Sequence, residues 1–353
     1  MTKETIQAVL DNHDPIGLLA DGAPNDEYLP EVNQLFSKIR TGMSAKEIST
    51  LLRDTFSEMF AEISLEASLC EAMAADLLSA DLFDKSKDKQ YYIVSDVHSF
   101  YTILKNTLEE KGFFEREDNV LVLLGDAFDR GSETTELGEF LLSLHEQDRL
   151  IYIRGNHEDL LVRCLQQLAR GESPINIATS LHVQNGTWDT LLALAGMSEA
   201  EAVSFPQELV RRVMNSRVYR VLLPTCIDYF ETERFVFTHG YLPCKESGDP
   251  LNIIYRYRKD WREADTTSWY RARWMNGVRV AVENNLKIPE KTVVCGHWHT
   301  SFFHSKYAGH GSEWGEDADF SPYHDERVGI IGIDACTAFS KKMNCLVFNS
   351  TEL

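Results

Sequence analysis

Five short polar clusters contain most of the residues in this sequence that could do chemistry. Each follows a short apolar run and is rich in Asp, Asn and His: Asp96-Val97-His98, Gly125 to Gly131, Gly155-Asn156-His157-Glu158, Thr238-His239-Gly240 and Gly296-His297-Trp298-His299. Helix capping needs only one short polar residue at each place, so capping alone does not explain five such clusters. Mixed oxygen and imidazole donors suit divalent ions of the manganese, iron and zinc type. The clusters therefore predict a metal site.

The apolar runs before these clusters have the length of buried strands. Amphipathic stretches separate the first three runs, and one of them places Leu137, Leu141 and Leu144 together with Phe140 on one helical face. This alternation predicts parallel strands in an α/β domain, and the less regular later runs predict a second, mixed sheet. Loops that leave the carboxyl ends of parallel strands converge on one crevice, so we expect the five clusters to share one edge. The runs are 91–94, 120–124, 150–153, 235–237, 292–295, 328–333 and 345–348.

Residues 1–89 are predicted to form a helical N-terminal extension before a catalytic domain at residues 90–353. Ser44-Ala45-Lys46-Glu47 has the form of a capping box, and apolar residues at helical spacing follow it to Phe60. A second helix is predicted from about Ser64 to Leu82, and the lysine-rich stretch Lys85–Lys89 is predicted to be the linker. Within the catalytic domain, residues 172–230 are expected to be mostly helical and to form a wall of the cleft. The extension could be a cap, an oligomerisation element or a regulatory arm.

Composition excludes several classes of function. The 353 residues include 35 basic and 55 acidic side chains, and the resulting net charge of −20 disfavours a nucleic-acid partner. No apolar run approaches the roughly 20 residues that a membrane span needs, and the first residues do not resemble a signal or transit peptide. Seven cysteines without a Cys-x-x-Cys pair indicate reduced thiols and a cytoplasmic protein.

From about Tyr91 to Phe348 the sequence resembles the calcineurin-like metallophosphoesterases, and within them the phosphoprotein phosphatase group. That group includes bacterial Ser/Thr phosphatases and symmetrical diadenosine tetraphosphatases. The resemblance rests on four segments: the Gly-Asp-x-x-Asp-Arg-Gly element at 125–131, Gly-Asn-His-Glu at 155–158, Asn185 to Leu191, and Ile333 to Cys336. Ser95 and Ser99 depart from the glycines usual there. The resemblance implies an α/β fold in which a two-sheet β-sandwich is flanked by helices.

The same resemblance implies a centre of two divalent ions, manganese first, with iron or zinc as alternatives. Asp96 and His98 would bind one ion. Asn156, His239 and His297 would bind the other, and Asp126 would bridge both. His299 is expected to approach the Asp96 ion, with a place at the solvent-facing rim as the alternative. The implied nucleophile is a hydroxide that bridges the metals.

The resemblance also assigns the acid and the phosphate contacts. His157 would protonate the leaving oxygen, Asp129 would orient its imidazole, and Arg130 would bind phosphate oxygens beside Asn156. A second phosphate-binding arginine is expected at Arg273 or Arg271, and nothing in the spacing selects between them. His304, His310 and His324 lie in a polar, Gly-rich region and are expected to be exposed and to bind nothing.

Three functions compete at this stage. The first is hydrolysis of phosphomonoesters, including phosphoserine or phosphothreonine in proteins, and the second is cleavage of nucleotide anhydrides such as diadenosine tetraphosphate. Both need the same metal pair and a phosphorylated partner, so they differ only in the cleft wall. The third is a metal-bound scaffold without activity. Its signature would be a missing ligand or acid pair, and none is missing here.

Overall fold

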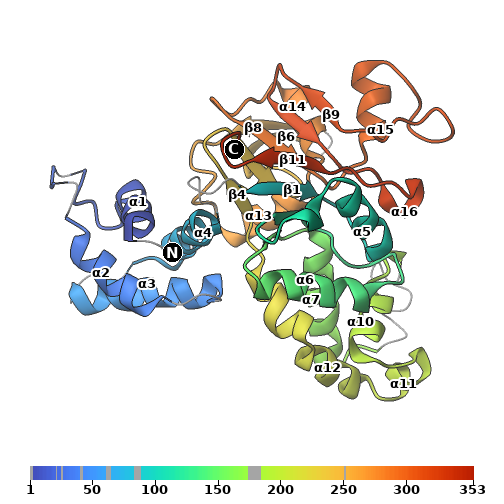
Figure 1. Ribbon diagram of the computed structural model, residues 1–353, viewed down its shortest axis with the longest axis horizontal. Helices are drawn as coiled ribbons and strands as arrows, with labels where there is room; N and C mark the ends of the chain where they lie inside the picture. The colour runs from blue at the N-terminus through green and yellow to red at the C-terminus, as the bar shows by residue number, and fades with distance from the viewer. Residues whose placement is uncertain are drawn as a thin grey trace. The chain divides into compact units, whose positions relative to one another are not determined.

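The computed structural model describes residues 3–20, 22–24, 27–39, 43–60, 65–82, 89–173, 184–249 and 252–353 (Figure 1). The chain divides into two compact units. The first comprises Met1–Lys87 with the short segment Asp260–Asp265, and the second comprises Asp88–Lys259 and Thr266–Leu353. Most of the predicted linker at Lys85–Lys89 lies outside the described residues.

The first unit is helical and has its own hydrophobic core. Its described helices are α1 (Lys3–His13), α2 (Leu29–Lys38), α3 (Ala45–Met59) and α4 (Ala67–Leu82). The predicted capping box begins α3, because the Ser44 hydroxyl accepts from the Glu47 amide while the Glu47 carboxylate accepts from the Ser44 amide. Residues from all four helices are buried together, among them Ile6, Val32, Leu52, Phe56 and Met73.

The first sheet of the second unit has the strand order β11-β1-β2-β3. Its strands are β1 (Gln90–Val94), β2 (Val120–Leu124), β3 (Leu150–Ile153) and β11 (Leu346–Asn349). The first three are parallel, as predicted, with α5 (Tyr101–Glu110) and α6 (Thr134–Glu146) in the crossovers, and η1 (Phe113–Glu115) follows α5. β11 pairs antiparallel with β1.

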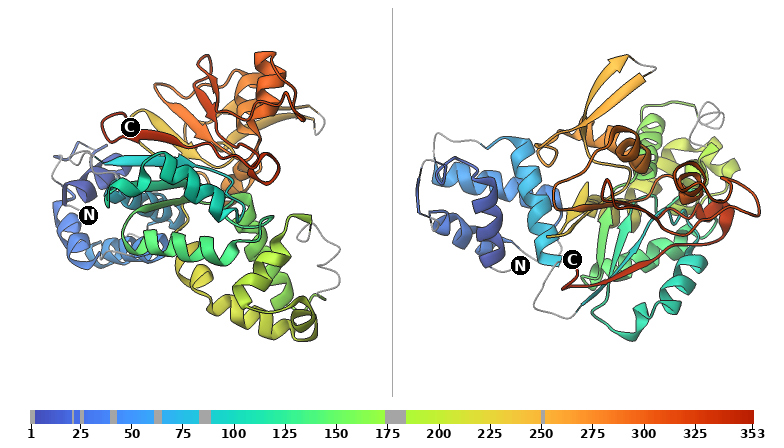
Figure 2. Two further views of the ribbon diagram at one scale, coloured as in Figure 1. Left: turned by 45° about the vertical axis from the view of Figure 1, so that its right-hand side comes forward. Right: turned by 90° about the horizontal axis from the view of Figure 1, so that it is seen from above.

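The second sheet is mixed, as predicted, with the order β4-β5-β8-β10-β9. Its strands are β4 (Tyr229–Glu231), β5 (Phe235–Thr238), β8 (Thr292–Cys295), β9 (Tyr323–Asp325) and β10 (Ile330–Gly332). β5, β8 and β10 are parallel, and β4 and β9 run antiparallel at the edges. Aromatic side chains join the two sheets, because the Phe348 ring lies 4.9 Å from that of Phe235 and the Tyr91 ring lies 6.5 Å from that of Phe230. The expected β-sandwich is confirmed (Figure 2).

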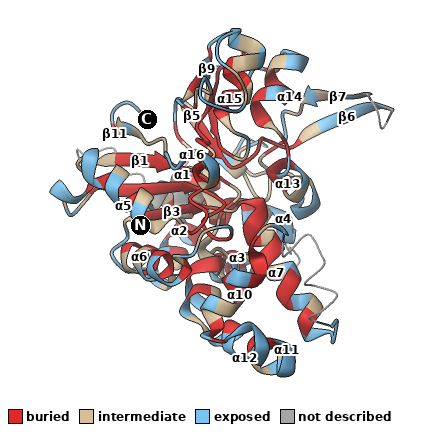
Figure 3. Cartoon of the chain, turned by 90° about the vertical axis from the view of Figure 1, so that its right-hand side faces the viewer, coloured by how far each residue is buried: buried red, intermediate tan, exposed pale blue. Residues whose placement is uncertain are grey.

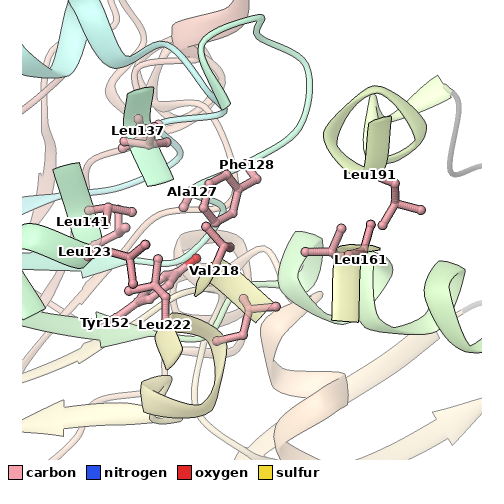
Figure 4. Packing of buried hydrophobic residues seen from close by; sticks show 14 of the residues in the cluster. Leu123, Ala127, Phe128, Leu137, Leu141, Tyr152, Leu161, Leu191, Val218 and Leu222 are labelled. Carbon is pink, nitrogen blue, oxygen red and sulfur yellow. The ribbon is translucent and has the colours of Figure 1, made fainter. Parts of the chain in front are cut away.

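The other face of the first sheet is covered by helices. Alternate side chains of β2 and β3, such as Leu123 and Tyr152, pack there against Leu137 and Leu141 of α6 (Figure 4). Phe128, from the loop after β2, lies in the same cluster. Burial of each such Leu or Phe side chain stabilises the folded state by roughly 1.5–3 kcal/mol. The strand ends that carry the polar clusters therefore start from a rigid base.

The remaining elements surround this sandwich. They are α7 (Asn156–Ala169), α10 (Thr187–Ala195), α11 (Glu199–Ser204), α12 (Pro206–Asn215), η2 (Val218–Leu222), η3 (Leu223–Thr225), α13 (Thr266–Arg273), α14 (Gly277–Asn284), α15 (Thr300–Phe303), η4 (His304–Ala308) and α16 (Thr337–Ser340). The hairpin of β6 (Cys244–Asp249) and β7 (Asn252–Tyr257) extends away from both sheets and exposes Ile253 and Ile254 (Figure 3). None of the helices in the described part of the chain has the length and apolar character of a membrane span.

Candidate metal centre

The five polar clusters follow β1, β2, β3, β5 and β8, and their side chains meet at one place. Two groups of possible metal ligands form there, one of His98, Asp126 and His157 and one of Asp126, His239 and His297. Within each group the ligand atoms lie within 4.8 Å of one another. Asp126 belongs to both groups and is thus the shared carboxylate.

Asp126 presents its two oxygens to different histidines. Its Oδ1 atom lies 3.3 Å from His239 Nε2, and its Oδ2 atom lies 3.8 Å from the Nε2 atoms of both His98 and His157. The amide of His157 donates to Oδ1 at 2.9 Å and fixes the carboxylate. A Cβ atom at Gly155 would lie 2.2 Å from the same oxygen, so only glycine leaves room for the carboxylate there.

Asp96 connects the first cluster to the fifth. Its Oδ1 atom lies 4.0 Å from His98 Nε2, and its Oδ2 atom accepts a hydrogen bond from the His297 amide at 3.0 Å. Burial raises the pKa of Asp96 to about 6 and that of Asp126 to about 7. Two buried carboxylates need compensating positive charge. Divalent ions would supply it, and the Asp, Asn and His donors fit such ions.

Three histidines each hydrogen-bond to a backbone carbonyl through one ring nitrogen, which leaves the other ring nitrogen available to a metal. The Nδ1 atom of His98 lies 3.0 Å from the Phe128 oxygen and that of His239 lies 2.7 Å from the Leu124 oxygen, while the His297 ring bonds to the Trp274 oxygen. Burial lowers the pKa of all three imidazoles, which favours the neutral form that binds metals. Such carbonyl partners typically orient metal-binding histidines.

Asn156 adds an oxygen to the second group. Its Oδ1 atom lies 2.8 Å from His239 Nε2. When His239 Nδ1 donates to the Leu124 carbonyl, Nε2 carries a lone pair, so two acceptors face each other. A cation shared by both atoms satisfies this arrangement, and the side chain of Asn156 therefore fits the ligand role that the sequence suggests.

His157, Asp129 and Arg130 form a second feature beside the ligands. His157 Nδ1 lies 2.7 Å from Asp129 Oδ2, and the hydroxyls of Thr187 and Thr190 each donate to Asp129 at 2.7 Å. Burial by itself lowers the pKa of His157, but Asp126 and Asp129 outweigh it and raise the pKa. Arg130 is exposed, with one guanidinium nitrogen 3.3 Å from His157 Nε2. A histidine, a carboxylate and a guanidinium thus converge beside the ligands.

Two expected site residues are not brought to the centre. His299 Nε2 lies 3.0 Å from Glu313 Oε1, and its ring lies 4.4 Å from Trp314, outside both ligand groups. The side chain of His299 is only 12% exposed, so its approach to the Asp96 ion and its place at a solvent-facing rim both stay predictions. Arg273 is buried and bonded to Asp159 at 2.7 Å and to Asp228 at 2.5 Å, so its guanidinium is committed to structural ion pairs.

Some residues that shape the site were given no role by sequence reasoning. Buried Glu158 accepts from the amides of Gly155, Asp126 and Ala127 at 2.7 to 3.0 Å and from the Tyr152 hydroxyl. Its position three residues after the Gly155 N-cap of α7 was the available signal. Asp334 follows β10 and is buried, and burial together with the charge of Asp96 raises its pKa well above the usual value.

The backbone at the centre is strained. The left-handed region, which costs an L-residue about 1–2 kcal/mol, is occupied by six residues of the proposed site: Asp96, His98, Asp126, Asp129, Arg130 and His297, with φ from 50° to 76°. Such strain typically gathers at functional sites, where the surrounding packing holds it.

The fold and the grouped ligands together place this protein in a class of α/β sandwiches that have a His- and Asp-rich site at the carboxyl ends of their strands. The chain belongs to the calcineurin-like phosphoesterase family, whose model matches residues 90–318. The resemblance seen in the sequence to this family is confirmed.

Curated relatives match in parts. The asymmetrical bis(5'-nucleosyl)-tetraphosphatase PrpE of Bacillus subtilis (strain 168) is 25% identical over 139 residues, 37% of this chain and 52% of that protein. Serine/threonine-protein phosphatase 2 of Escherichia coli (strain K12) is 30% identical over 78 residues, 22% of this chain and 34% of that protein. The chain thus spans about half the length of these relatives or less. A solved structure of a putative diadenosine tetraphosphatase aligns over 73% of this chain and 89% of its own, with 15% identity and a TM-score of 0.38.

Proposed function

We propose that this protein hydrolyses phosphomonoesters, including phosphoserine and phosphothreonine in proteins, at a centre of two divalent ions. Manganese is the first candidate and iron and zinc follow. The observation that carries the proposal is the position of Asp126, which is shared by two groups of ligands. A carboxylate with two oxygens can span a metal pair roughly 3.5–4 Å apart.

We divide the ligands between the two ions as the sequence resemblance implies, which puts Asp96, 4.0 Å from His98, in the first set in place of His157 of the geometric group. Asp96, His98 and Asp126 would bind the first ion. Asp126, Asn156, His239 and His297 would bind the second. Bound ions of this kind polarise phosphoryl oxygens and lower the pKa of a coordinated water.

The remaining groups bind and protonate the substrate. Arg130 is exposed beside His157, so its guanidinium can receive phosphate oxygens in a bidentate manner. His157 is the proposed general acid for the leaving oxygen, because Asp129 favours its protonated form and fixes its ring. The two threonines behind Asp129 keep this pair aligned without contacting substrate.

Nucleotide anhydrides are the second candidate substrate, and a groove beside the centre favours them. The groove has a volume of about 720 Å³, and its lining includes Tyr255, Tyr270, Trp274 and Arg271. It borders the centre because the Trp274 carbonyl accepts from the His297 ring. Aromatic faces stack on nucleobases and an arginine pairs with phosphates, so a nucleotide matches this lining.

The test is steady-state hydrolysis by metal-stripped protein to which Mn²⁺, Zn²⁺ or Mg²⁺ is restored. Substrates are p-nitrophenyl phosphate, a phosphopeptide and diadenosine tetraphosphate. Metal-dependent turnover with the phosphopeptide preferred supports the first proposal, and preference for the dinucleotide replaces it with the second. Absence of turnover despite two bound ions per chain would contradict both and favour a binding scaffold.

A cytoplasmic location is part of the proposal. All seven cysteines are free thiols in the structure and lie buried or half-buried. Reduced thiols of this kind are typical of proteins from reducing compartments.

A further inference from the structure

A third group of possible metal ligands lies outside the proposed dinuclear centre. It consists of His304, His310 and Asp319, whose ligand atoms lie within 4.8 Å of one another. His304 is the first residue of η4, and the other two belong to the segment that follows it before β9. The expectation that His304 is exposed is wrong, because only 9% of its surface is accessible.

His304 contains the atom that indicates a ligand. Its Nε2 atom lies 3.1 Å from the backbone oxygen of Ser321, a contact that a ring N–H makes. The Nδ1 atom then carries a lone pair, and this buried atom has no hydrogen-bond donor among the residues that the structure describes. A buried acceptor without a donor costs about 1–3 kcal/mol, so the arrangement calls for a partner.

Asp319 faces both imidazoles with one oxygen. Its Oδ1 atom is occupied, because it accepts from the Ser321 amide at 2.9 Å. Its Oδ2 atom lies 3.9 Å from His304 Nδ1 and 3.6 Å from His310 Nε2. Both separations exceed the 2.7–3.2 Å range of a hydrogen bond. In a tetrahedral zinc site with bonds of about 2.0–2.2 Å, two ligand atoms lie about 3.5 Å apart, so small shifts of these side chains bring the three atoms into ligand positions.

The loop is built to bring these side chains together. The two imidazole rings stack with centroids 4.8 Å apart, and the His310 amide bonds to the His304 carbonyl at 3.2 Å. Gly311 has φ of +67°, and a Cβ atom there would lie 2.6 Å from the Asp317 oxygen. Glycine is therefore required for the turn that returns Asp319 toward the histidines.

We propose that His304, His310 and Asp319 bind a zinc-type divalent ion that is separate from the dinuclear centre. Two imidazole nitrogens and one carboxylate oxygen are a common ligand set for zinc, and the exposed side of His310 leaves a fourth position for water. The Ser321 backbone supports two of the ligands, as the second layer of a metal site does.

This ion would stabilise one rim of the dinuclear centre. The loop between His310 and Asp319 contains Glu313 and Trp314, and both contact His299, two residues after the proposed ligand His297. The Ser301 hydroxyl also donates to the Glu313 carbonyl at 2.8 Å. An ion at the base of the loop fixes these contacts without entering the reaction.

The test counts Zn²⁺ ions per chain in the full-length protein. Metal-stripped wild type, His310→Ala and Asp319→Asn are incubated with Zn²⁺, passed through gel filtration and analysed by mass spectrometry. We expect each variant to lose one ion per chain relative to wild type. Both substituted side chains are at least partly exposed, so folding is retained, and thermal unfolding checks this. His324→Ala, an exposed histidine outside the group, is the matched control and keeps the wild-type number.

Hydrogen exchange of residues 304–319 gives a second readout. Zn²⁺ should slow exchange there in wild type and in Asp126→Asn, whose dinuclear centre is impaired, but not in His310→Ala. Equal zinc content in wild type, His310→Ala and Asp319→Asn would overturn the proposal, and so would unchanged exchange on adding Zn²⁺. The Asp126→Asn variant tests the group of His304, His310 and Asp319 when the dinuclear centre is impaired. These results therefore distinguish failure of this inference from failure of the proposed function.

Discussion

His157 Nδ1 and Asp129 Oδ2 lie 2.7 Å apart, and both side chains are almost inaccessible to solvent. Thr187 and Thr190 hold the carboxylate from behind, so the imidazole has one orientation, with Nε2 facing Arg130 and Asp126. A histidine fixed in this way can donate a proton in one direction only. We propose that the pair acts in protonation of the leaving group and that His157, which also lies in the first ligand group, does not bind a metal.

Asp129→Asn should reduce kcat by about 10²-fold or more while leaving metal content unchanged, because it removes the charge that favours protonated His157. His157→Asn should behave alike. Substrates with very good leaving groups should be affected less, since they need little protonation. Steady-state kinetics on p-nitrophenyl phosphate and on an alkyl phosphate measure the difference. Asp148→Asn, at an exposed turn, is the control, and equal losses on both substrates would argue against an acid role.

Asp126→Asn should abolish assembly of the metal pair and activity together. Metal content measured after gel filtration should fall, and added Mn²⁺ should no longer raise the unfolding temperature as it does for wild type. Full activity in this variant would remove the bridging role. Without metal the variant should be at least as stable as wild type, because the substitution removes a carboxylate that is buried among uncompensated charges.

The two arginines of α13 should have different roles, Arg273 in the stability of the fold and Arg271 in substrate binding. Arg273→Ala should lower the free energy of unfolding by roughly 1–3 kcal/mol, because it removes the buried partner of Asp228 and one of the two arginines that pair with Asp159. Arg271 is exposed and its side chain has no hydrogen-bond or ion-pair partner in the described part of the chain, so Arg271→Ala should change stability by less than about 0.5 kcal/mol.

Arg271→Ala should instead raise KM for a nucleotide substrate, because its guanidinium lines the groove beside the centre. Denaturant unfolding and steady-state kinetics on the same preparations check both statements. A stable Arg273→Ala variant with a raised KM would reverse the assignment.

The N-terminal unit should lose stability in acid through Asp14. Burial raises the pKa of Asp14, but the Tyr28 hydroxyl at 2.6 Å and the amides of Ala20 and Leu19 outweigh it and lower the pKa. A lowered folded pKa stabilises the fold above the unfolded value of about 3.9, and this stabilisation disappears as the pH falls through the folded value.

The difference in unfolding temperature between wild type and Asp14→Asn should therefore be largest near neutral pH and should shrink below about pH 4. Thermal unfolding followed by circular dichroism from pH 3 to pH 7 measures it. Exposed Asp54 on α3 provides the control substitution, Asp54→Asn, and a pH-independent gap for Asp14→Asn would contradict the assignment.

The sequence by itself determined the elements and the class of site. Short continuous apolar runs and the helical periodicity between them identify β1, β2, β3 and the mixed second sheet, because strands buried on both faces are apolar throughout. Polar clusters directly after such runs must lie at the carboxyl ends of strands. The presence of Asp, Asn and His there predicts a metal centre, and the structure brings these residues into groups that could hold metal ions.

Only the tertiary structure decided which side chains meet. Asp126 touches His239 across 113 positions of sequence, and Asp129 meets Thr190 across 61. Arg273 is committed to Asp159, 114 positions away, for the same kind of reason. Such pairings depend on strand register, on the packing of one sheet against the other and on the turns between them. These are long-range properties that the periodicity of a single segment does not encode.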